Sequence, residues 1–129
     1  MLDLYDEMFS LINPIVTSYS DHYPTDKEAE DGHKIYPYAE FSFPNTMPNN
    51  EWSNNFLLSV DVWDNKSGIV KEIETLTDSI YQALNKKLIN YGSKFIQINR
   101  NSPCILSLPD PELNIQRRQL RFILKVYPA

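Results

Sequence analysis

The sequence predicts an α+β domain in which a mostly antiparallel, four-stranded sheet carries two helices on one face. The expected order is helix, strand, strand, helix, strand, strand. In two segments, 2–16 and 68–88, apolar residues recur every three or four positions, as along one side of a helix. In four other segments apolar residues are spaced as in short strands, and most clearly alternate with polar ones. At 129 residues the chain is expected to form one domain, residues 1–129.

The first predicted helix spans residues 2–16. Acidic residues at its start suit the positive end of the helix dipole. Pro14 has no amide hydrogen to donate, so we expect it to kink or end this helix near Asn13. The apolar stripe consists of Tyr5, Met8, Phe9, Ile12, Ile15 and Val16.

Residues 17–34 are predicted to form a solvated, mobile loop. The segment is acidic, has almost no apolar side chains and contains Pro24 and Gly32. Compact domains seldom keep so long a loop without a role. Its two histidines, His22 and His33, lie among carboxylates, but their spacing fits no metal-ligand pattern, so we expect solvated side chains and no metal.

The first two strands are predicted at 36–43 and 55–63, joined by a polar loop at 44–55. Pro37 places the first of them at a sheet edge, or marks its beginning. The two strands most simply form an antiparallel pair. One face of the second strand is apolar throughout and consists of Phe56, Leu58, Val60 and Val62.

The second predicted helix spans 68–88, with Ser67 or Asn65 as its N-cap. Its last turn is expected to hold Lys86 and Lys87, which suit the negative end of the dipole, and Gly92 then ends the segment. The apolar stripe consists of Ile69, Ile73, Leu76, Ile80, Leu84 and Leu88.

The last two strands are predicted at 94–100 and 116–127. Between them, residues 102–113 hold three prolines and form a loop or an interrupted edge strand. The final strand has one apolar and one charged face, as expected for an antiparallel strand with one side in water.

Motifs of enzymes and cofactor sites are missing from the sequence. Its three glycines are scattered, and it contains no phosphate-binding loop, zinc-protease motif or nucleophile elbow. Asp61 and Asp64 flank Trp63, yet no histidine or lysine is fixed beside them, so a surface or capping role is expected. The single cysteine, Cys104, is expected to be a small buried or half-buried apolar residue. We therefore predict no catalytic residue, no cofactor and no metal.

The charge and hydropathy of the chain exclude other classes. A net charge of −5 argues against tight or sequence-specific nucleic-acid binding, because such proteins usually present a basic face. No apolar run approaches the roughly 20 residues needed to cross a bilayer. The acidic start of the chain is also unlike a signal peptide.

Five side chains are candidates for a subunit or partner interface. Trp52 lies beside Met47 in a polar loop, where it either anchors a partner or folds back onto its own sheet. Arg117, Arg118 and Arg121 either bridge carboxylates of a neighbouring subunit or are solvated strand residues.

Three short segments and the long helix resemble the tail-completion (tail-terminator) family of long-tailed bacteriophages. The segments read Ile35-Tyr36-Pro37-Tyr38-Ala39-Glu40-Phe41, Leu58-Ser59-Val60-Asp61-Val62-Trp63 and Arg118-Gln119-Leu120-Arg121-Phe122. Each is simple strand patterning, so the resemblance depends on their order and spacing over most of the chain. The long acidic loop at 17–34 departs from the usual pattern.

The resemblance implies a structural protein of a phage or prophage and not an enzyme. Such a protein forms a homo-oligomeric ring, typically a hexamer, that stops polymerisation of the tail tube protein and joins the tail to the head-tail connector. DNA passes through the ring, and an acidic lumen would not trap it. The protein is then expected in the host cytoplasm during assembly and later in the virion at the tail–head junction.

Two other functions remain open. One is another role in phage assembly, as a neck protein, head-tail connector or tail-assembly protein with a different partner. The other is a small monomeric binding module that captures a ligand or peptide with the Trp52 loop.

Overall fold

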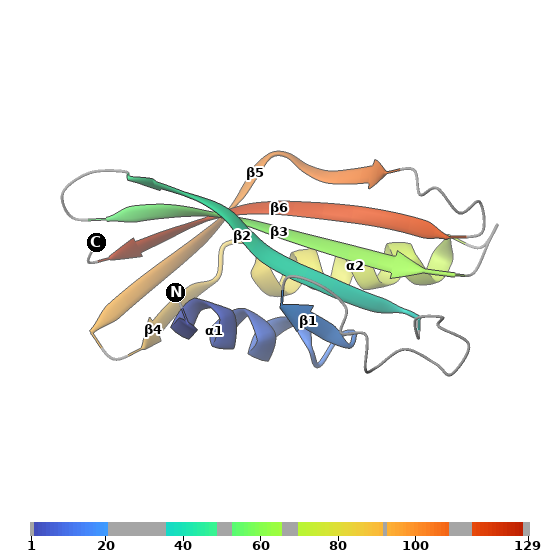
Figure 1. Ribbon diagram of the computed structural model, residues 1–129, viewed down its shortest axis with the longest axis horizontal. Coiled ribbons are helices and arrows are strands. Elements are labelled where there is room, and N and C mark those ends of the chain that lie inside the picture. Colours follow the sequence, from blue (N-terminus) through green and yellow to red (C-terminus); the bar gives the residue numbers. More distant parts are fainter. Residues whose placement is uncertain are drawn as a thin grey trace.

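The computed structural model describes residues 2–20, 36–48, 53–65, 70–91, 93–108 and 115–127. Trp52, His22, His33 and most of the predicted loop lie outside these ranges. Figure 1 shows a long twisted sheet with both helices against one of its faces. The elements are α1 (Leu2–Ile12), β1 (Ser18–Ser20), β2 (Tyr38–Pro48), β3 (Asn54–Asp64), α2 (Lys71–Leu84), β4 (Leu88–Tyr91), β5 (Lys94–Leu108) and β6 (Gln116–Tyr127).

The strands form one six-stranded, curled sheet in the order β1-β2-β3-β6-β5-β4. β1 runs parallel to β2, and every other neighbouring pair is antiparallel. The prediction of a four-stranded sheet in the order helix, strand, strand, helix, strand, strand is therefore wrong. The two strands it missed, β1 and β4, have three and four residues, too few to show an alternating pattern.

β1 lies inside the segment predicted as a loop. Its three residues pair in register with Ala39, Glu40 and Phe41, and the amide of Ala39 donates to the carbonyl of Thr17 at 2.9 Å. Ser18 is buried, although its own sequence gives no apolar signal. Pairing with β2 and not local propensity decides this strand.

The helices end earlier than their apolar stripes. α1 stops at Ile12, as Pro14 predicts, and the amides of Ile15 and Val16 both donate to the carbonyl of Ile12. α2 spans 14 residues, its N-cap Val70 makes no side-chain capping bond, and Ser67 lies outside the described residues.

The predicted basic last turn of α2 is wrong. The helix ends at Leu84, and Lys86 then has a φ of 62°, a left-handed conformation that no longer continues the helix. Lys86 and Lys87 therefore form the turn into β4, and Leu88 begins a strand.

The other strands were predicted with varying success. β6 spans the predicted residues, β3 is one residue longer at each end, and β2 pairs antiparallel with β3 as expected. β2 also continues through the predicted loop to Pro48, after an irregularity in register between Ser42 and Asn45. β5 continues to Leu108, which agrees with the interrupted-strand alternative for 102–113 as far as the described residues reach.

The core lies between the sheet and the two helices. α1 contributes Leu4, Met8 and Ile12, and α2 contributes Ile73, Ile80 and Leu84. Alternate residues of the central strands point to this inner face because successive strand side chains alternate. They include Leu58, Val60, Val62, Leu120, Phe122, Leu124, Ile96 and Ile98. The other face of the sheet, the outer face, carries no described helix (Figure 1).

Candidate functional site

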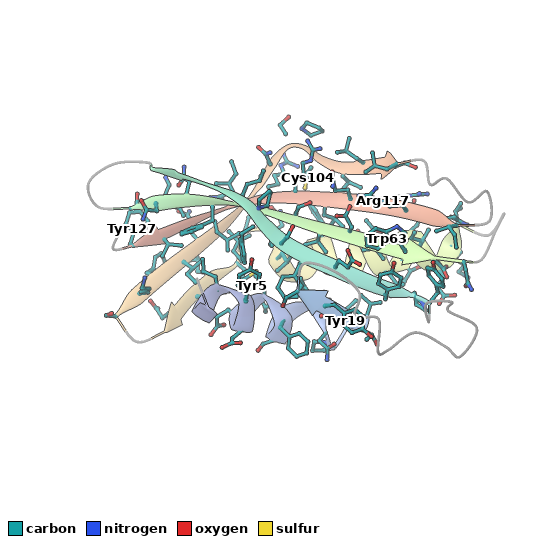
Figure 2. All side chains as sticks on the ribbon, in the orientation of Figure 1. Tyr5, Tyr19, Trp63, Cys104, Arg117 and Tyr127 are labelled. Atoms are coloured by element: carbon teal, nitrogen blue, oxygen red, sulfur yellow. The ribbon has the colours of Figure 1, made fainter. Side chains whose placement is uncertain are left out.

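A cluster of polar and aromatic side chains lies on the outer face of β2, β3 and β6. The strand register brings its members together: Tyr38 is opposite Trp63, Trp63 is opposite Arg117, and Asp61 is opposite Gln119. Figure 2 shows Trp63 and Arg117 at the same end of the sheet. We call this set, with Arg121, the outer-face cluster.

Trp63 is flanked within the sheet by one aromatic ring and one cation. Its ring stacks on Tyr38, with centroids 5.1 Å apart and an interplanar angle of 17°. On the β6 side, Cζ of Arg117 lies 5.1 Å from the centroid of the same ring. A guanidinium over a tryptophan is attracted by the ring's negative face, so Trp63 fixes β2 and β6 on either side of β3.

The polar side chains of Arg117 and Gln119 both donate to one carboxylate oxygen. Asp61 Oδ1 accepts hydrogen bonds from Arg117 Nη2 at 3.0 Å, Arg117 Nε at 3.3 Å and Gln119 Nε2 at 3.1 Å. The side chains of Arg117 and Asp61 are 29% and 15% exposed, so this ion pair is partly shielded from water. The charge of Arg117 is thereby neutralised within its own chain.

Arg118 lies on the opposite face of the sheet. Its Nε donates to Glu74 Oε1 of α2 at 2.7 Å, and its Nη1 donates to the backbone carbonyl of Arg117 at 3.1 Å. Only 14% of its side chain is exposed. Arg118 therefore ties α2 to β6.

Arg121 differs from the other two arginines of β6. Its Nε donates to Gln119 Oε1 at 3.0 Å, and it makes no ion pair within the described part of the chain. On the neighbouring strand β5, Arg100 also makes no ion pair within the described part of the chain. It donates to a neutral group, the Tyr81 hydroxyl, at 3.4 Å. Arg100 directly precedes the irregular stretch of β5 on the helix-bearing face, whereas Arg121 of β6 lies beside that stretch on the outer face.

Cys104 sits in the irregular stretch of β5 (Figure 2). Burial raises the pKa of its thiol, against smaller lowering effects from the Arg121 backbone hydrogen bond and the charge of Arg100. The side chain is half-buried against the core, as expected from the sequence.

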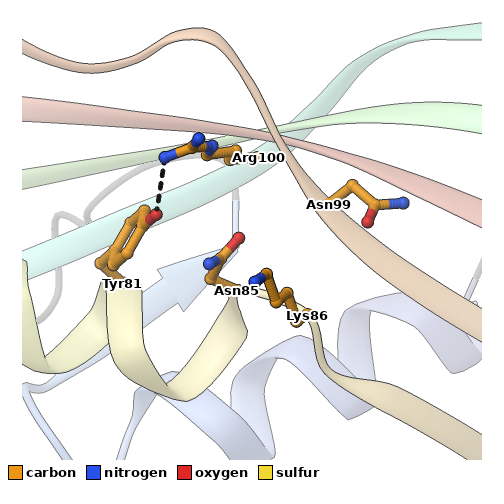
Figure 3. A pocket seen from close by; sticks show the side chains of 5 residues that line it. All are labelled: Tyr81, Asn85, Lys86, Asn99 and Arg100. Atoms are coloured by element: carbon orange, nitrogen blue, oxygen red, sulfur yellow. Dashed lines mark hydrogen bonds between the residues drawn. The ribbon is translucent and has the colours of Figure 1, made fainter.

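A hollow of about 370 Å³ opens at the C-terminal end of α2. Figure 3 shows Arg100 and Tyr81 facing each other across it, with Asn85 and Lys86 from the turn that follows α2 and Asn99 from β5. Amide and cationic groups here could bind a polar or anionic group. The negative end of the helix dipole weakens that attraction.

Asp61 and Asp64 do not form a carboxylate pair. They lie on opposite faces of β3, and Asp64 is fully buried on the inner face. Asp64 Oδ1 accepts the amide of Asn65 at 2.9 Å, and its burial shows that the surface role expected for it is wrong, whereas the capping role stays a prediction.

No protein-family model matches the chain, and no curated protein matches its sequence. Within the described ranges, no group of three or more potential metal-binding side chains comes together. Neither α1 nor α2 is long and apolar enough to cross a membrane.

The predicted interface residues are therefore spread over the molecule. Arg117 and Arg121 share the outer face, whereas Arg118 lies on the inner one. Met47 pairs with Asn55 at the far end of β3 from Trp63, and its side chain, like the whole of Trp52, lies outside the described residues. All five residues remain predictions.

The structure adds one feature that sequence reasoning missed, an open edge on the second half of β5. Proline content had marked this segment as a loop or interrupted strand. Its lack of any charged residue over 101–108 was the available signal, because exposed edges usually carry charges.

Proposed function

We propose that the chain is a structural protein of a phage or prophage that assembles into a ring at the head-proximal end of the tail tube. The ring ends polymerisation of the tube and provides the surface that joins tail to head. Its partners are further copies of itself, in a hexamer, together with the tail tube protein and the head-tail connector. It acts in the host cytoplasm during assembly and then remains in the virion.

The observation that carries this proposal is that the two edges of the sheet differ. On one side the last described strand is β1, only three residues long. On the other side β4 covers only Lys94–Gln97 of the much longer β5. A ring needs two different surfaces on opposite sides of each subunit, because each copy contacts its neighbours head to tail.

Two further features support the proposal. The segments that carry the family resemblance lie in β3, in β6 and at the start of β2, which are neighbours in the sheet. Tyr38 stacks on Trp63, and Gln119 donates to Asp61. The net charge of −5 also suits a ring through which DNA must pass without being held.

The experiment is a mass measurement in solution followed by a tube-binding test. Size exclusion with light scattering should give a discrete oligomer, near 91 kDa for six copies of a 15.1 kDa chain. Electron microscopy with tubes of the cognate tail tube protein should then place rings at one tube end and show shorter tubes.

Two outcomes would contradict the proposal. A ring that binds a connector but ignores tubes would favour the neck-protein alternative. A chain that stays monomeric at every concentration, and is absent from tube ends, would favour the monomeric binding module.

A further inference from the structure

We infer that the second half of β5, residues 101–108, is the surface on which each subunit adds its sheet to that of the next copy. We call these residues the open edge segment. The inference rests on the proposed ring and names the contact that builds it: an edge-to-edge strand pairing between the open edge segment and the β1 side of the neighbouring copy.

The backbone of the open edge segment is paired on one side only. β4 pairs with β5 over Lys94–Gln97, and the carbonyl of Lys87 accepts the amide of Ile98. Beyond that point no described strand lies against the outer edge of β5. An edge of this kind presents unpaired N–H and C=O groups and is a template for another strand.

An irregularity turns the open edge segment away from the first half of β5. Arg100 pairs with Phe122 and Ile105 pairs with Leu120, so the four residues 101–104 face a single residue, Arg121. Figure 1 shows β5 bending outward here before it returns alongside β6. Bulges re-aim a strand, and this one projects the edge of residues 105–108.

The open edge segment lacks the protection that solvent-exposed edges usually have. Its sequence, NSPCILSL, contains no charged residue, and its one proline precedes the last five residues. Ile105 is 45% exposed, and Leu106 and Leu108 are only half-buried. A β-prone, uncharged edge is an aggregation hazard unless a partner covers it.

The charges around the open edge segment favour a head-to-tail partner. Arg100 directly precedes it in β5, on the helix-bearing face, and has no acidic partner in the described part of the chain. A partner that brings acidic side chains to Arg100 is therefore favoured.

The opposite side of the molecule offers the complementary charge. α1 contacts β1, and its Asp6 and Glu7 make no ion pair with any described residue. Contact between the open edge segment and the β1 side of the next copy therefore brings opposite charges together. The same contact repeats from copy to copy, as a ring requires.

The test compares two lysine substitutions at exposed apolar residues. Ile105→Lys places a charge in the proposed contact, whereas Val70→Lys, at 53% exposure at the start of α2 and on neither side of the contact, is the control. Light scattering over a concentration series should show that Ile105→Lys raises the concentration needed for assembly about tenfold or more. Val70→Lys should assemble like the unmodified chain, and circular dichroism should show that both variants are folded.

The outcomes separate this inference from the proposed function. If the unmodified chain forms rings and Ile105→Lys forms them equally well, the inference is overturned and the ring proposal stands. If the unmodified chain forms only dimers that Ile105→Lys dissociates, the head-to-tail contact and the ring proposal both fail. Loss of the ring in Ile105→Lys alone supports both.

A charge exchange tests the direction of pairing. Arg100→Glu should weaken assembly, and adding Asp6→Lys to the same chain should restore part of it, because the opposite charges are then exchanged. If the double variant assembles no better than Arg100→Glu, the β1 side is not the partner of the open edge segment.

Discussion

The two halves of β5 differ although they belong to one strand and share β6 as a neighbour. In the first half, Ile96 and Ile98 are fully buried beneath the helices, and β4 covers part of the outer edge. In the second half no residue is fully buried, and no described strand covers the outer edge. Pairing with β6 is thus sufficient to define a strand, but burial requires a second layer or a further strand.

This difference separates what the subunit needs in order to fold from what it presents to others. The first half contributes to the core, so its side chains stabilise the monomer. The second half contributes little to the core, so its apolar side chains gain most of their burial when another chain covers them.

The largest expected effect is the contrast between Ile98→Ala and Ile105→Ala. Removing the buried Ile98 side chain should lower the free energy of unfolding by about 3 kcal/mol, because it leaves a cavity in the core. The same change at Ile105, which is 45% exposed, should cost about 0.5 kcal/mol. Urea unfolding under dilute, monomeric conditions measures both. Equal costs would mean that the second half of β5 is part of the core after all.

A smaller effect is expected for the ion pair between Asp61 of β3 and Arg117 of β6. Arg117 is the residue of β6 that pairs with Leu108, in the second half of β5. A double-mutant cycle with Asp61→Ala and Arg117→Ala should give a coupling of about 1 kcal/mol, because the pair is only partly exposed and shares its carboxylate with Gln119. The same cycle in 1 M salt should retain most of this value. A coupling near zero would show that this side of β6 does not depend on the outer-face cluster.

A glycine substitution in the turn before β4 should change the free energy of unfolding by an amount similar to or smaller than this coupling energy. Lys86→Gly should raise the free energy of unfolding by about 0.5–1 kcal/mol, since glycine adopts the positive φ of this residue without steric cost. Lys87→Gly, the matched control at the next residue, should lower it. If both substitutions lowered the free energy of unfolding equally, this would contradict the left-handed conformation of Lys86 in the turn that brings β4 to the first half of β5.

The smallest effect concerns the Cys104 thiol. Because burial raises its pKa, less thiolate is present at pH 8 than in an unfolded chain, and iodoacetamide should react more slowly with the folded protein. The raised pKa contributes stability that is complete below the ordinary thiol pKa and is lost as the pH rises through the folded value. Mass spectrometry follows the alkylation, which should slow further on assembly. Alkylation at the unfolded rate would show that the thiol is not shielded.

Local patterns predicted part of this fold. The final strand was predicted correctly because its alternation continues without interruption from Gln116 to Tyr127. Pro14 predicted the end of α1, since proline has no amide hydrogen to donate and this holds in any tertiary surroundings. β1 and β4 could not be predicted because three or four residues are too few to show an alternating pattern. Their strand conformation is determined by pairing with strands that are distant in the sequence.

The candidate site was less predictable than the fold. Asp61 and Arg117 are 56 residues apart, and only the register of β3 on β6 brings them together. The sequence marked Arg117, Arg118 and Arg121 as one group, and strand alternation would have placed Arg118 on the other face from the remaining two. The open edge of β5 depends on how short β4 is, which the sequence did not reveal.

Hydrogen exchange of the β5 amides, measured in the assembled protein and in the dilute monomer, tests the central claim most directly. The first half should exchange slowly in both states. In the second half, the amides of residues 105–108 that point away from β6 should exchange rapidly in the monomer and slowly in the assembly. Equally rapid exchange of these amides in both states would show that no strand of a second copy covers this edge.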